Sequence, residues 1–301
     1  MIGRVVRIGG KTFDVTTGAG RLTCEFRGRL KKDRQAVVRL VAVGDAVEVT
    51  PTEGTEGIIE KVLPRRSKLS RPSAGNARKE QVIVANVDAI LIVQSARNPD
   101  LDLLTVDRCT VMASAAGLPA AFCVNKTDLG PAKGVEVYPP IGIPVFQTSA
   151  VRSEGLDTLR AYLDGKTTVF IGPSGVGKSS LLNSLHPAAG VKTGKVSDRT
   201  GGGRHTTTWA ELVELAPGTY VTDTPGLEIF TLWEITAASL RDYFQEFVEP
   251  GAKCKYRNCS HQSEPHCAVL EALRSGAIAA SRQANYVSIR KALADQPSLF
   301  G

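Results

Sequence analysis

Gly172-Pro173-Ser174-Gly175-Val176-Gly177-Lys178-Ser179-Ser180 follows a β-branched and aromatic run at 167–171, and residues 181–185 continue with helical character. Strand, glycine-rich loop and helix are the setting in which G-x-x-x-x-G-K-[ST] binds phosphate. The loop turns its backbone N–H groups inward, and the helix N-terminus adds a positive dipole end. Lys178 is expected to reach the β- and γ-phosphates, and Ser179 to ligate Mg²⁺. The alternative, an ordinary Gly/Ser turn, is disfavoured because the whole motif occurs in this setting.

The composition is that of a soluble globular protein. The 301 residues are 42% apolar and 22% charged, and they suffice for two or three domains. No run of 18 apolar residues occurs, and the first residues carry charges where a signal peptide needs an apolar stretch. We therefore expect a cytoplasmic protein without membrane contact. Of six cysteines, Cys24, Cys109 and Cys123 are expected to be buried thiols, and the other three cluster late.

The positive charge is concentrated in the first quarter of the chain. Residues 1–80 hold 17 Lys and Arg against 9 Asp and Glu, whereas the remainder holds 20 against 21. Such a distribution suits a polyanionic partner, and RNA is the leading candidate in a cytoplasmic protein. The alternative is a basic but merely solvated surface.

Residues 1–63 are predicted to form short strands separated by glycine-containing turns. Strands are expected at 4–8, 12–15, 22–26, 37–41, 46–50 and 57–62. This spacing favours a five-stranded barrel of the oligonucleotide-binding (OB) type, although an SH3-like barrel gives nearly the same pattern. Phe13 and Phe26 are the segment's only aromatic residues. Backbone electrostatics and shape, rather than base stacking, should therefore dominate RNA binding.

The next segments change character twice. Residues 64–81 are rich in Arg, Lys, Ser, Pro and Gly and predict a basic linker or flexible loop. From residue 82 strands and helices alternate, with strands at 89–93, 120–124, 145–148 and 220–222 and helices at 103–116 and 156–163. This alternation predicts an α/β domain built on a parallel sheet.

Three further short motifs follow predicted strands, where ligands bind in open α/β sheets. In Asn125-Lys126-Thr127-Asp128, the carboxylate can accept from both guanine N–H donors, and adenine lacks that donor pair. Asn125 would brace the base and the loop, while the Lys126 stem would cover a ring face. Ser149-Ala150 would supply a backbone N–H to the guanine oxygen. In Asp223-Thr224-Pro225-Gly226, Asp223 would hold Mg²⁺ through water, and the Gly226 N–H would meet the γ-phosphate.

The order of these motifs is circularly permuted, because the guanine motif precedes the phosphate loop. With this order, the sequence resembles the ribosome small subunit-dependent GTPase A family over essentially its whole length. The resemblance rests also on Val84-Ala85-Asn86-Val87-Asp88, on Gly203-Arg204-His205-Thr206-Thr207-Thr208 and on a late Cys/His cluster. It implies hydrolysis of GTP to GDP and phosphate, stimulated by the small (30S) ribosomal subunit and its rRNA, late in assembly of that subunit.

Catalysis is expected to depend on the first switch segment at 194–208. Leu227 follows the Asp-x-x-Gly motif, where many GTPases have a Gln that orients water, and the family shares this apolar replacement. By resemblance Thr207 is the Mg²⁺-ligating threonine, with Thr206 as the adjacent alternative. His205 is the candidate for positioning the water, and the alternative is an exposed or RNA-contacting histidine. Lys178 completes the expected catalytic set. Gly175 stands where an Asn would ligate potassium, so a monovalent-cation requirement is not supported.

A metal site is predicted in the last part of the chain. Cys254, Cys259, His261 and Cys267 make a complete tetrahedral set for one structural Zn²⁺, and the resemblance favours His261 over its rival His266. The alternative is free cysteines in a loop. A helix is expected at 239–247, and helices within 268–293 should pack over the module.

Together these features predict three domains: an OB-type barrel that binds RNA at 1–70, a circularly permuted GTPase at 71–235 and a zinc-binding helical domain at 236–301. Two other functions share the motifs. One is a GTP-dependent RNA-binding scaffold with negligible turnover, which Leu227 keeps open, and the other is a GTPase acting on another RNA such as tRNA. Nothing in the sequence indicates an oligomer.

Overall fold

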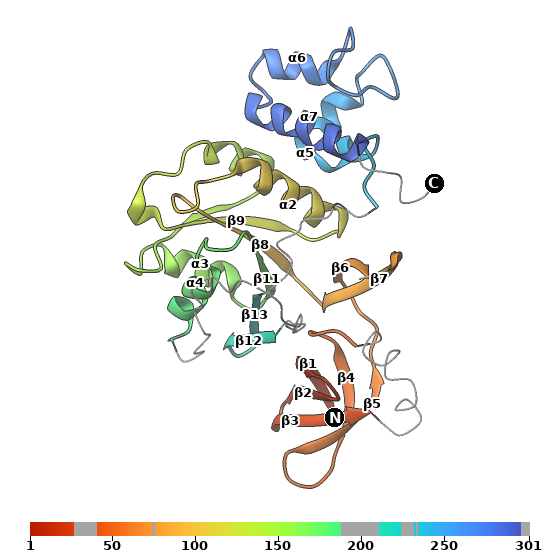
Figure 1. The fold of residues 1–301 in the computed structure, drawn as a ribbon, viewed down its shortest axis with the longest axis vertical. Helices are drawn as coiled ribbons and strands as arrows, with labels where there is room; N and C mark the ends of the chain where they lie inside the picture. Colours follow the sequence, from red (N-terminus) through yellow and green to blue (C-terminus); the bar gives the residue numbers. More distant parts are fainter. Residues whose placement is uncertain (27–40, 74–75, 188–210, 224–231, 233, 296–301) are drawn as a thin grey trace, which may run out of the picture.

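The computed structural model describes residues 1–26, 41–73, 76–187, 211–223, 232 and 234–295. Three units follow one another along the long axis of the molecule: a β-barrel that contains the N-terminus, a central sheet with helices on both faces, and a helical unit at the opposite end (Figure 1). Among the described residues, no helix combines the length and apolarity that crossing a bilayer requires. The expected circularly permuted α/β fold with an added barrel and a helical tail is confirmed.

The barrel contains five strands, at β1 (Ile2–Gly9), β2 (Thr12–Thr17), β3 (Gly20–Phe26), β4 (Ala46–Pro51) and β5 (Glu56–Val62). They follow the order β1-β2-β3-β5-β4, and antiparallel pairing of β4 with β1 closes the barrel. Alternate residues such as Val5, Val15 and Val47 fill its core, as the period of two requires. The OB-type barrel predicted from the sequence is therefore confirmed. The strand expected at 37–41 lies outside the described residues except for Val41, which is in no strand.

The basic segment at 64–81 is not the linker or flexible loop that its composition predicted. Strands β6 (Lys68–Ser73) and β7 (Asn76–Ala85) form an antiparallel hairpin, in which Lys68 pairs with Ala85 and Leu69 with Val84. Leu69 and Val84 are fully buried in the core of the central unit. Burial of these two residues therefore outweighs the loop-like composition around them.

The central sheet has the order β10-β9-β8-β11-β13-β12. Strands β8 (Ala89–Ser95), β9 (Ala120–Asn125), β10 (Val145–Gln147), β11 (Thr167–Ile171) and β13 (Thr219–Asp223) run parallel, and β12 (Glu211–Ala216), which the sequence did not predict, is antiparallel to β13. Helix α2 (Leu103–Ala115) packs on one face of the sheet. Helices α3 (Leu156–Leu163) and α4 (Lys178–Leu185) pack on the other. The parallel strands consequently bring their carboxyl ends, and the motifs that follow them, to one edge.

Short 3-10 helices occupy the connections, at η2 (Thr127–Leu129), η3 (Val135–Val137) and η4 (Pro139–Ile141). The C-terminal unit comprises η6 (Leu240–Tyr243), α5 (Gln245–Gly251), α6 (Ala268–Arg274) and α7 (Ala280–Ala294). The single helix expected at 239–247 is wrong, because the backbone becomes extended at Phe244. Phe244 is fully buried and packs edge-on against Tyr286, so a tertiary contact interrupts the local pattern. The helices expected within 268–293 are confirmed.

Candidate nucleotide and metal sites

The glycines of the phosphate loop are required by close backbone approach. Gly172 has φ of 154°, and a Cβ there would lie 2.0 Å from the carbonyl oxygen of Val93 on the neighbouring strand. Gly177 has φ of 91°, and its Cβ would lie 2.5 Å from Nδ2 of Asn125. Any side chain at either position would collide, so the loop keeps the backbone path that turns its N–H groups inward.

Lys178 begins α4 and folds back over the loop. Its Nζ donates to the carbonyl oxygens of Gly172 at 2.8 Å and Pro173 at 3.0 Å. A phosphate is the stronger partner for an ammonium group than a neutral carbonyl, because both members of the pair are charged. Ser179 and Ser180 occupy the first turn of α4, while Ser174 and Gly175 are exposed and Val176 is buried. The loop therefore presents the lysine and the helix N-terminus where a phosphate would bind.

Asn125, the last residue of β9, joins three segments that the sequence predicted to meet. Its Nδ2 donates to the carbonyl oxygen of Val176 at 3.1 Å, within the phosphate loop. Its Oδ1 accepts from the backbone N–H of Ala150 at 3.2 Å and from the Thr148 hydroxyl at 3.4 Å. Asn125 is 1% exposed, so this buried side chain holds the phosphate loop and the Ser149-Ala150 segment together. The Ser149 N–H donates to the carbonyl oxygen of Glu154, so the backbone N–H groups of both Ser149 and Ala150, one of which was expected to meet the guanine oxygen, have protein partners here.

Lys126 and Asp128 lie at the carboxyl end of β9. Lys126 has φ of 59°, and its Nζ donates to the carbonyl oxygen of Gly175 at 2.6 Å and to that of Asn98. Its stem therefore crosses between the guanine motif and the phosphate loop. The Ser149 hydroxyl donates to Oδ1 of Asp128 at 2.6 Å, which orients the carboxylate. The sequence predicts only a backbone role for Ser149, because the contact between its hydroxyl and Asp128 joins residues 21 positions apart.

The loop from β8 to α2 is a second feature that sequence reasoning missed. The Ser95 hydroxyl donates to the carbonyl oxygen of Pro99 at 2.7 Å, and Asn98 accepts from Lys126. Pro99 lies 3.7 Å from the position of a Cβ at Gly175. This loop therefore supports the phosphate loop from the side. Its sequence pattern, a polar and proline-containing turn directly after a buried strand, could have indicated it.

Several expected site residues cannot be placed. His205, Thr206, Thr207, Gly226 and Leu227 lie outside the described residues. Asp223 is the last residue of β13, two strands from β8 and next to β11, but its side chain is not among those described. The water-positioning and magnesium-ligating assignments therefore remain predictions.

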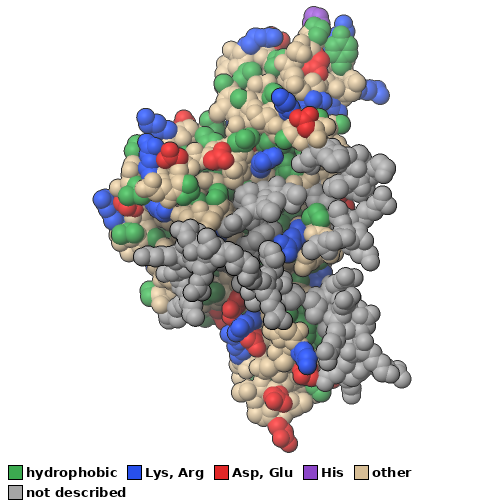
Figure 2. All heavy atoms as spheres, viewed as in Figure 1, with side chains coloured by type: hydrophobic (Ala, Val, Ile, Leu, Met, Phe, Trp, Pro, Cys, Tyr) green, Lys and Arg blue, Asp and Glu red, His purple; other side chains and the backbone are tan. Residues whose placement is uncertain are grey.

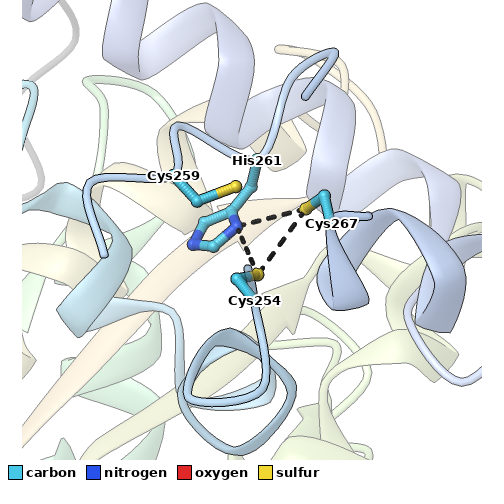
Figure 3. Close-up of side chains that lie close together, drawn as sticks. All are labelled: Cys254, Cys259, His261 and Cys267. Atoms are coloured by element: carbon cyan, nitrogen blue, oxygen red, sulfur yellow. Dashed lines mark hydrogen bonds between the residues drawn. The ribbon is translucent and has the colours of Figure 1, made fainter. Parts of the chain in front are cut away.

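The late cysteines and His261 converge on one point between α5 and α6 (Figure 3). His261 Nδ1 lies 3.4 Å from Sγ of Cys267 and 3.7 Å from Sγ of Cys254, and these two sulfurs are 3.9 Å apart. With Cys259, all four ligand atoms lie within 4.8 Å of one another. Ligands at zinc bonding distance and tetrahedral angles are separated by about 3.5–3.8 Å, so the set fits Zn²⁺. His266 is exposed and stays outside the cluster.

The loop that carries these ligands is held by polar contacts. The Glu264 carboxylate accepts from the backbone N–H groups of Ser260, Gln262 and Ser263, and its pKa falls to about 2. Arg241 donates to the carbonyl oxygen of Cys259 at 3.2 Å, and Tyr286 donates to that of Ser260 at 3.0 Å. The ligand loop is thereby tied to η6 and α7.

Burial shapes the chemistry of the ligands. It raises the pKa of Cys259 to about 12, assisted by the neighbouring thiols, and it lowers the pKa of His261. A neutral imidazole is the form that ligates metal, whereas thiolates crowded together need a cation. The donor set therefore fits a divalent ion, and a complete set of four protein ligands indicates a structural role.

Charge on the visible face of the described residues is mixed in sign. Figure 2 shows Lys, Arg, Asp and Glu side chains interspersed on the visible face of the described residues. All of the basic residues from Arg27 to Arg39 lie outside the described part, so the predicted polyanion-binding surface is not placed. Phe13 and Phe26, however, pack edge-on in the barrel core and are 1% and 6% exposed. Neither is available to stack on a base.

Comparison with known proteins gives one consistent result. The model of the RsgA GTPase family matches residues 62–233, and that of the RsgA N-terminal domain matches residues 2–59. The small ribosomal subunit biogenesis GTPase RsgA of Caldanaerobacter subterraneus subsp. tengcongensis is 38% identical over 95% of this chain and 94% of its own length. That of Gemmatimonas aurantiaca is 38% identical over 97% of both chains.

Solved structures agree with this result. YjeQ from Thermotoga maritima aligns with a TM-score of 0.79 and 34% identity over 98% of this chain and 99% of its own. YloQ, described as a circularly permuted GTPase, aligns with a TM-score of 0.75 and 27% identity, and the alignment covers 99% and 96% of the two chains.

Proposed function

The chain belongs to the RsgA GTPase family, and on that premise we propose that it hydrolyses GTP to GDP and phosphate in late maturation of the small ribosomal subunit. The observation that carries the proposal is the position of Asn125. This one buried side chain donates a hydrogen bond to Val176 in the phosphate loop and accepts one from Ala150 in the segment after β10. A guanine nucleotide site requires the phosphate-binding and base-binding segments to be held together in this way. Small ribosomal subunit biogenesis is the role named for the relatives, and we extend it to this chain.

Residues 172–180 bind the phosphates, and Asp128, Asn125 and Lys126 bind the guanine. Ser179, Thr207 and Asp223 ligate Mg²⁺, which neutralises charge on the β- and γ-phosphates. Ser149 supports this arrangement, because its hydroxyl holds the Asp128 carboxylate. A base without the N1–H and exocyclic amine would leave that carboxylate unpaired, so we expect GTP to be preferred over ATP by a large factor.

The three domains divide the remaining tasks. Residues 1–70 contact rRNA through backbone electrostatics, residues 71–235 hydrolyse GTP, and residues 236–301 bind one structural Zn²⁺. The buried positions of Phe13 and Phe26 support the electrostatic mode. The protein acts in the cytoplasm, as a monomer, with the small subunit as its partner.

GTP turnover measured alone and with purified small subunits, large subunits or bulk tRNA, at one salt concentration, tests this function. Selective stimulation by small subunits is expected. Equal stimulation by every RNA would favour a GTPase that acts on another RNA. Tight GTP binding with no stimulation would favour the scaffold, in which GTP is only a structural ligand.

His205 positions the attacking water in this proposal, since Leu227 cannot. His205→Ala should lower kcat by about 10²-fold or more while GTP affinity changes little, because general acid–base and positioning groups act on the transition state. His186→Ala is the matched control, as His186 follows α4 outside the predicted switch. Wild-type turnover in the His205 variant would remove this residue from the mechanism.

A further inference from the structure

The β12–β13 hairpin belongs to two hydrophobic cores at once. Leu212 and Tyr220 face the barrel and are 4% and 8% exposed within its core. Val213 and Val221 face the opposite way, into the core beneath α3 and α4. The alternation of a β-strand permits this, because successive side chains point to opposite faces. The hairpin therefore cannot shift without disturbing both the barrel and the GTPase unit.

Arg4, on barrel strand β1, contacts two neighbouring strands of the GTPase sheet, β11 and β13. Its guanidinium donates to Oγ1 of Thr167 at 2.8 Å and lies 4.6 Å from the centre of the Tyr220 ring. Thr167 and Tyr220 are register partners across β11 and β13. A single barrel side chain thus contacts the first residue of β11 through a hydrogen bond and the second residue of β13 through a cation–π contact.

These two strands lead directly to the phosphate site. Strand β11 runs from Thr167 to Ile171 and enters the phosphate loop at Gly172, and all five of its residues are buried. Strand β13 ends at Asp223, the predicted magnesium ligand. At the rise of a β-strand, five residues span about 15 Å, so Arg4 lies one short, rigid strand away from the phosphates.

The hairpin is also paired with the barrel along its outer edge. Strand β1 pairs antiparallel with β12 at Arg7 and Glu211, which joins the barrel and the GTPase sheet into one continuous sheet. Arg21 of β3 lies 3.5 Å from the same Glu211 carboxylate. In the chain, the predicted first switch at 194–208 ends three positions before Glu211, and the Asp-x-x-Gly motif begins at Asp223. The hairpin therefore connects the two phosphate-sensing motifs and is anchored to the barrel between them.

We propose that Arg4 and the β12–β13 hairpin transmit small-subunit contact at the barrel to the phosphate site, so that Arg4 is a positioning residue for stimulated GTP hydrolysis. This inference rests on the proposed function, in which the small subunit stimulates turnover. Subunit binding repositions the barrel, the Arg4 contact moves the first residues of β11 and β13 together, and Gly172 and Asp223 shift as a pair. Coupling requires an element that both sites bias, and the shared hairpin is that element.

The test compares Arg4→Met with the wild type, at saturating GTP, over a range of small-subunit concentrations. Methionine keeps the length of the side chain near Tyr220 but removes the charge and the hydrogen bond to Thr167. We expect the maximal stimulated turnover to fall about threefold or more, as single positions on a coupling element change it by about 2- to 30-fold. Basal turnover and GTP affinity should stay at the wild-type level.

Lys11→Met is the matched control, because Lys11 is an exposed cation of the same barrel in the turn between β1 and β2. It should change only the subunit concentration at half-maximal stimulation. Three results for Arg4→Met would overturn the inference: an unchanged maximum, an equal fall in basal turnover, or a shift confined to the half-maximal concentration. If the wild type itself is not stimulated, the proposed function fails, and this inference falls with it.

A disulfide cross-link between the barrel and the hairpin provides a second test, because it asks whether a new connection between them restores the stimulation lost in Arg4→Met. Arg7 and Glu211 are opposed across an antiparallel pair, where Cα atoms lie about 4.5–5.5 Å apart, a separation that a disulfide can bridge. Arg7→Cys with Glu211→Cys, added to Arg4→Met, should restore maximal stimulation when oxidised but not when reduced. Wild-type protein under the same oxidant, with its zinc content measured, controls for damage to the metal ligands. Failure of the oxidised form to recover would count against transmission through the hairpin.

Discussion

The GTPase unit is joined to its two neighbours by contacts of opposite kinds. The barrel joint comprises Arg4, Asn86, Asp88, Thr167, Leu212 and Tyr220. It combines apolar burial with one cation–π contact, partly exposed polar contacts and one buried hydrogen bond from Asn86 to the carbonyl oxygen of Gly44. The C-terminal joint comprises Asp107, Tyr138, Glu246, Arg282 and Asn285, and it is a buried charge network. Its central guanidinium, on α7, is 4% exposed, and the carboxylate of Asp107 on α2 is fully buried.

The difference indicates how each joint responds to displacement. At the C-terminal joint, Asp107 accepts from Arg282, from the Tyr138 hydroxyl at 2.7 Å and from Asn285 at 2.7 Å. Moving α7 away from α2 would leave buried charges without partners, which costs several kcal/mol. Apolar and cation–π contacts at the barrel joint vary more gradually with distance. We therefore expect a small displacement to cost less free energy at the barrel joint than at the C-terminal joint.

Removal of zinc should destabilise the protein more than any substitution at the two joints, and it should affect the C-terminal unit but not the barrel. Structural zinc contributes about 10–16 kcal/mol of apparent binding free energy at pH 7, and the ligand loop packs against α7 through Tyr286. With a chelator and a thiol reductant, amide exchange should rise sharply in residues 252–295 and remain unchanged in β1 to β5. His261→Ala should reproduce the effect, whereas His266→Ala, at an exposed position, should not. Unchanged exchange after metal removal would contradict the structural role.

Arg282→Met should be the most damaging single substitution at the C-terminal joint. It leaves the carboxylates of Asp107 and Glu246 buried without their cation, and breaking a buried pair in this way costs about 3–5 kcal/mol. Denaturant unfolding measures the loss. Arg274→Met, at an exposed position on α6, is the control and should change the free energy of unfolding by less than about 0.5 kcal/mol.

A triple variant sharpens that experiment. Replacing Asp107 with Leu, Glu246 with Leu and Arg282 with Met removes all three charges together. Apolar replacements of buried ion networks are often neutral, so the triple variant should be more stable than Arg282→Met alone. If the two are equally unstable, packing around α7 rather than unpaired charge determines the stability of the joint.

The nucleotide and metal motifs could be located from the sequence because each is a short local pattern with its own chemistry. The phosphate loop and the guanine motif each depend on a few consecutive residues, and the Cys/His set depends on residues 254–267. The first two follow parallel strands, whose carboxyl ends lie at the same edge of the sheet. The joints could not be predicted, because they link residues far apart in the chain. Asp107 and Arg282 lie on separate helices, and nothing local to either identifies the other.

The misassigned segments have a similar cause. Residues 64–81 have the composition of a loop, yet they contribute to a β-hairpin whose Leu69 and Val84 pack in the hydrophobic core of the GTPase unit, against residues far away in the sequence. The expected helix at 239–247 ends because Phe244 packs against Tyr286 of α7. The sequence alone predicts no structural role for the motif at 84–88. In the structure, Asn86 donates to the carbonyl oxygen of Gly44 at 2.9 Å and so ties the barrel to the GTPase unit. Tertiary contacts of this kind override local propensity.

Asp88→Asn should cause the smallest loss of unfolding free energy, because the contacts that Asp88 makes are partly exposed. Asp88 accepts from the Thr167 N–H at 2.8 Å and from Arg66, whose side chain is 55% exposed. Asparagine keeps a carbonyl acceptor for Thr167 but loses the charge, so we expect a loss of about 1 kcal/mol at pH 7. Asp100→Asn is the control, since the Asp100 side chain is 77% exposed and also faces an arginine, and it should change stability by less.

The pH dependence of that loss identifies its origin. The contacts to Arg66 and to the Thr167 N–H lower the pKa of Asp88 below its ordinary value of 3.8, against the opposing effect of burial. A carboxyl group with a depressed pKa in the folded state stabilises the fold fully above the unfolded value, and this contribution is lost as the pH falls through the folded value. The difference in unfolding free energy between wild type and Asp88→Asn should therefore be constant from about pH 5 to pH 7 and should shrink below pH 3.8. A difference that persists undiminished at lower pH would mean that the amide disturbs packing at the start of β11, and the barrel joint would then depend on shape rather than on charge.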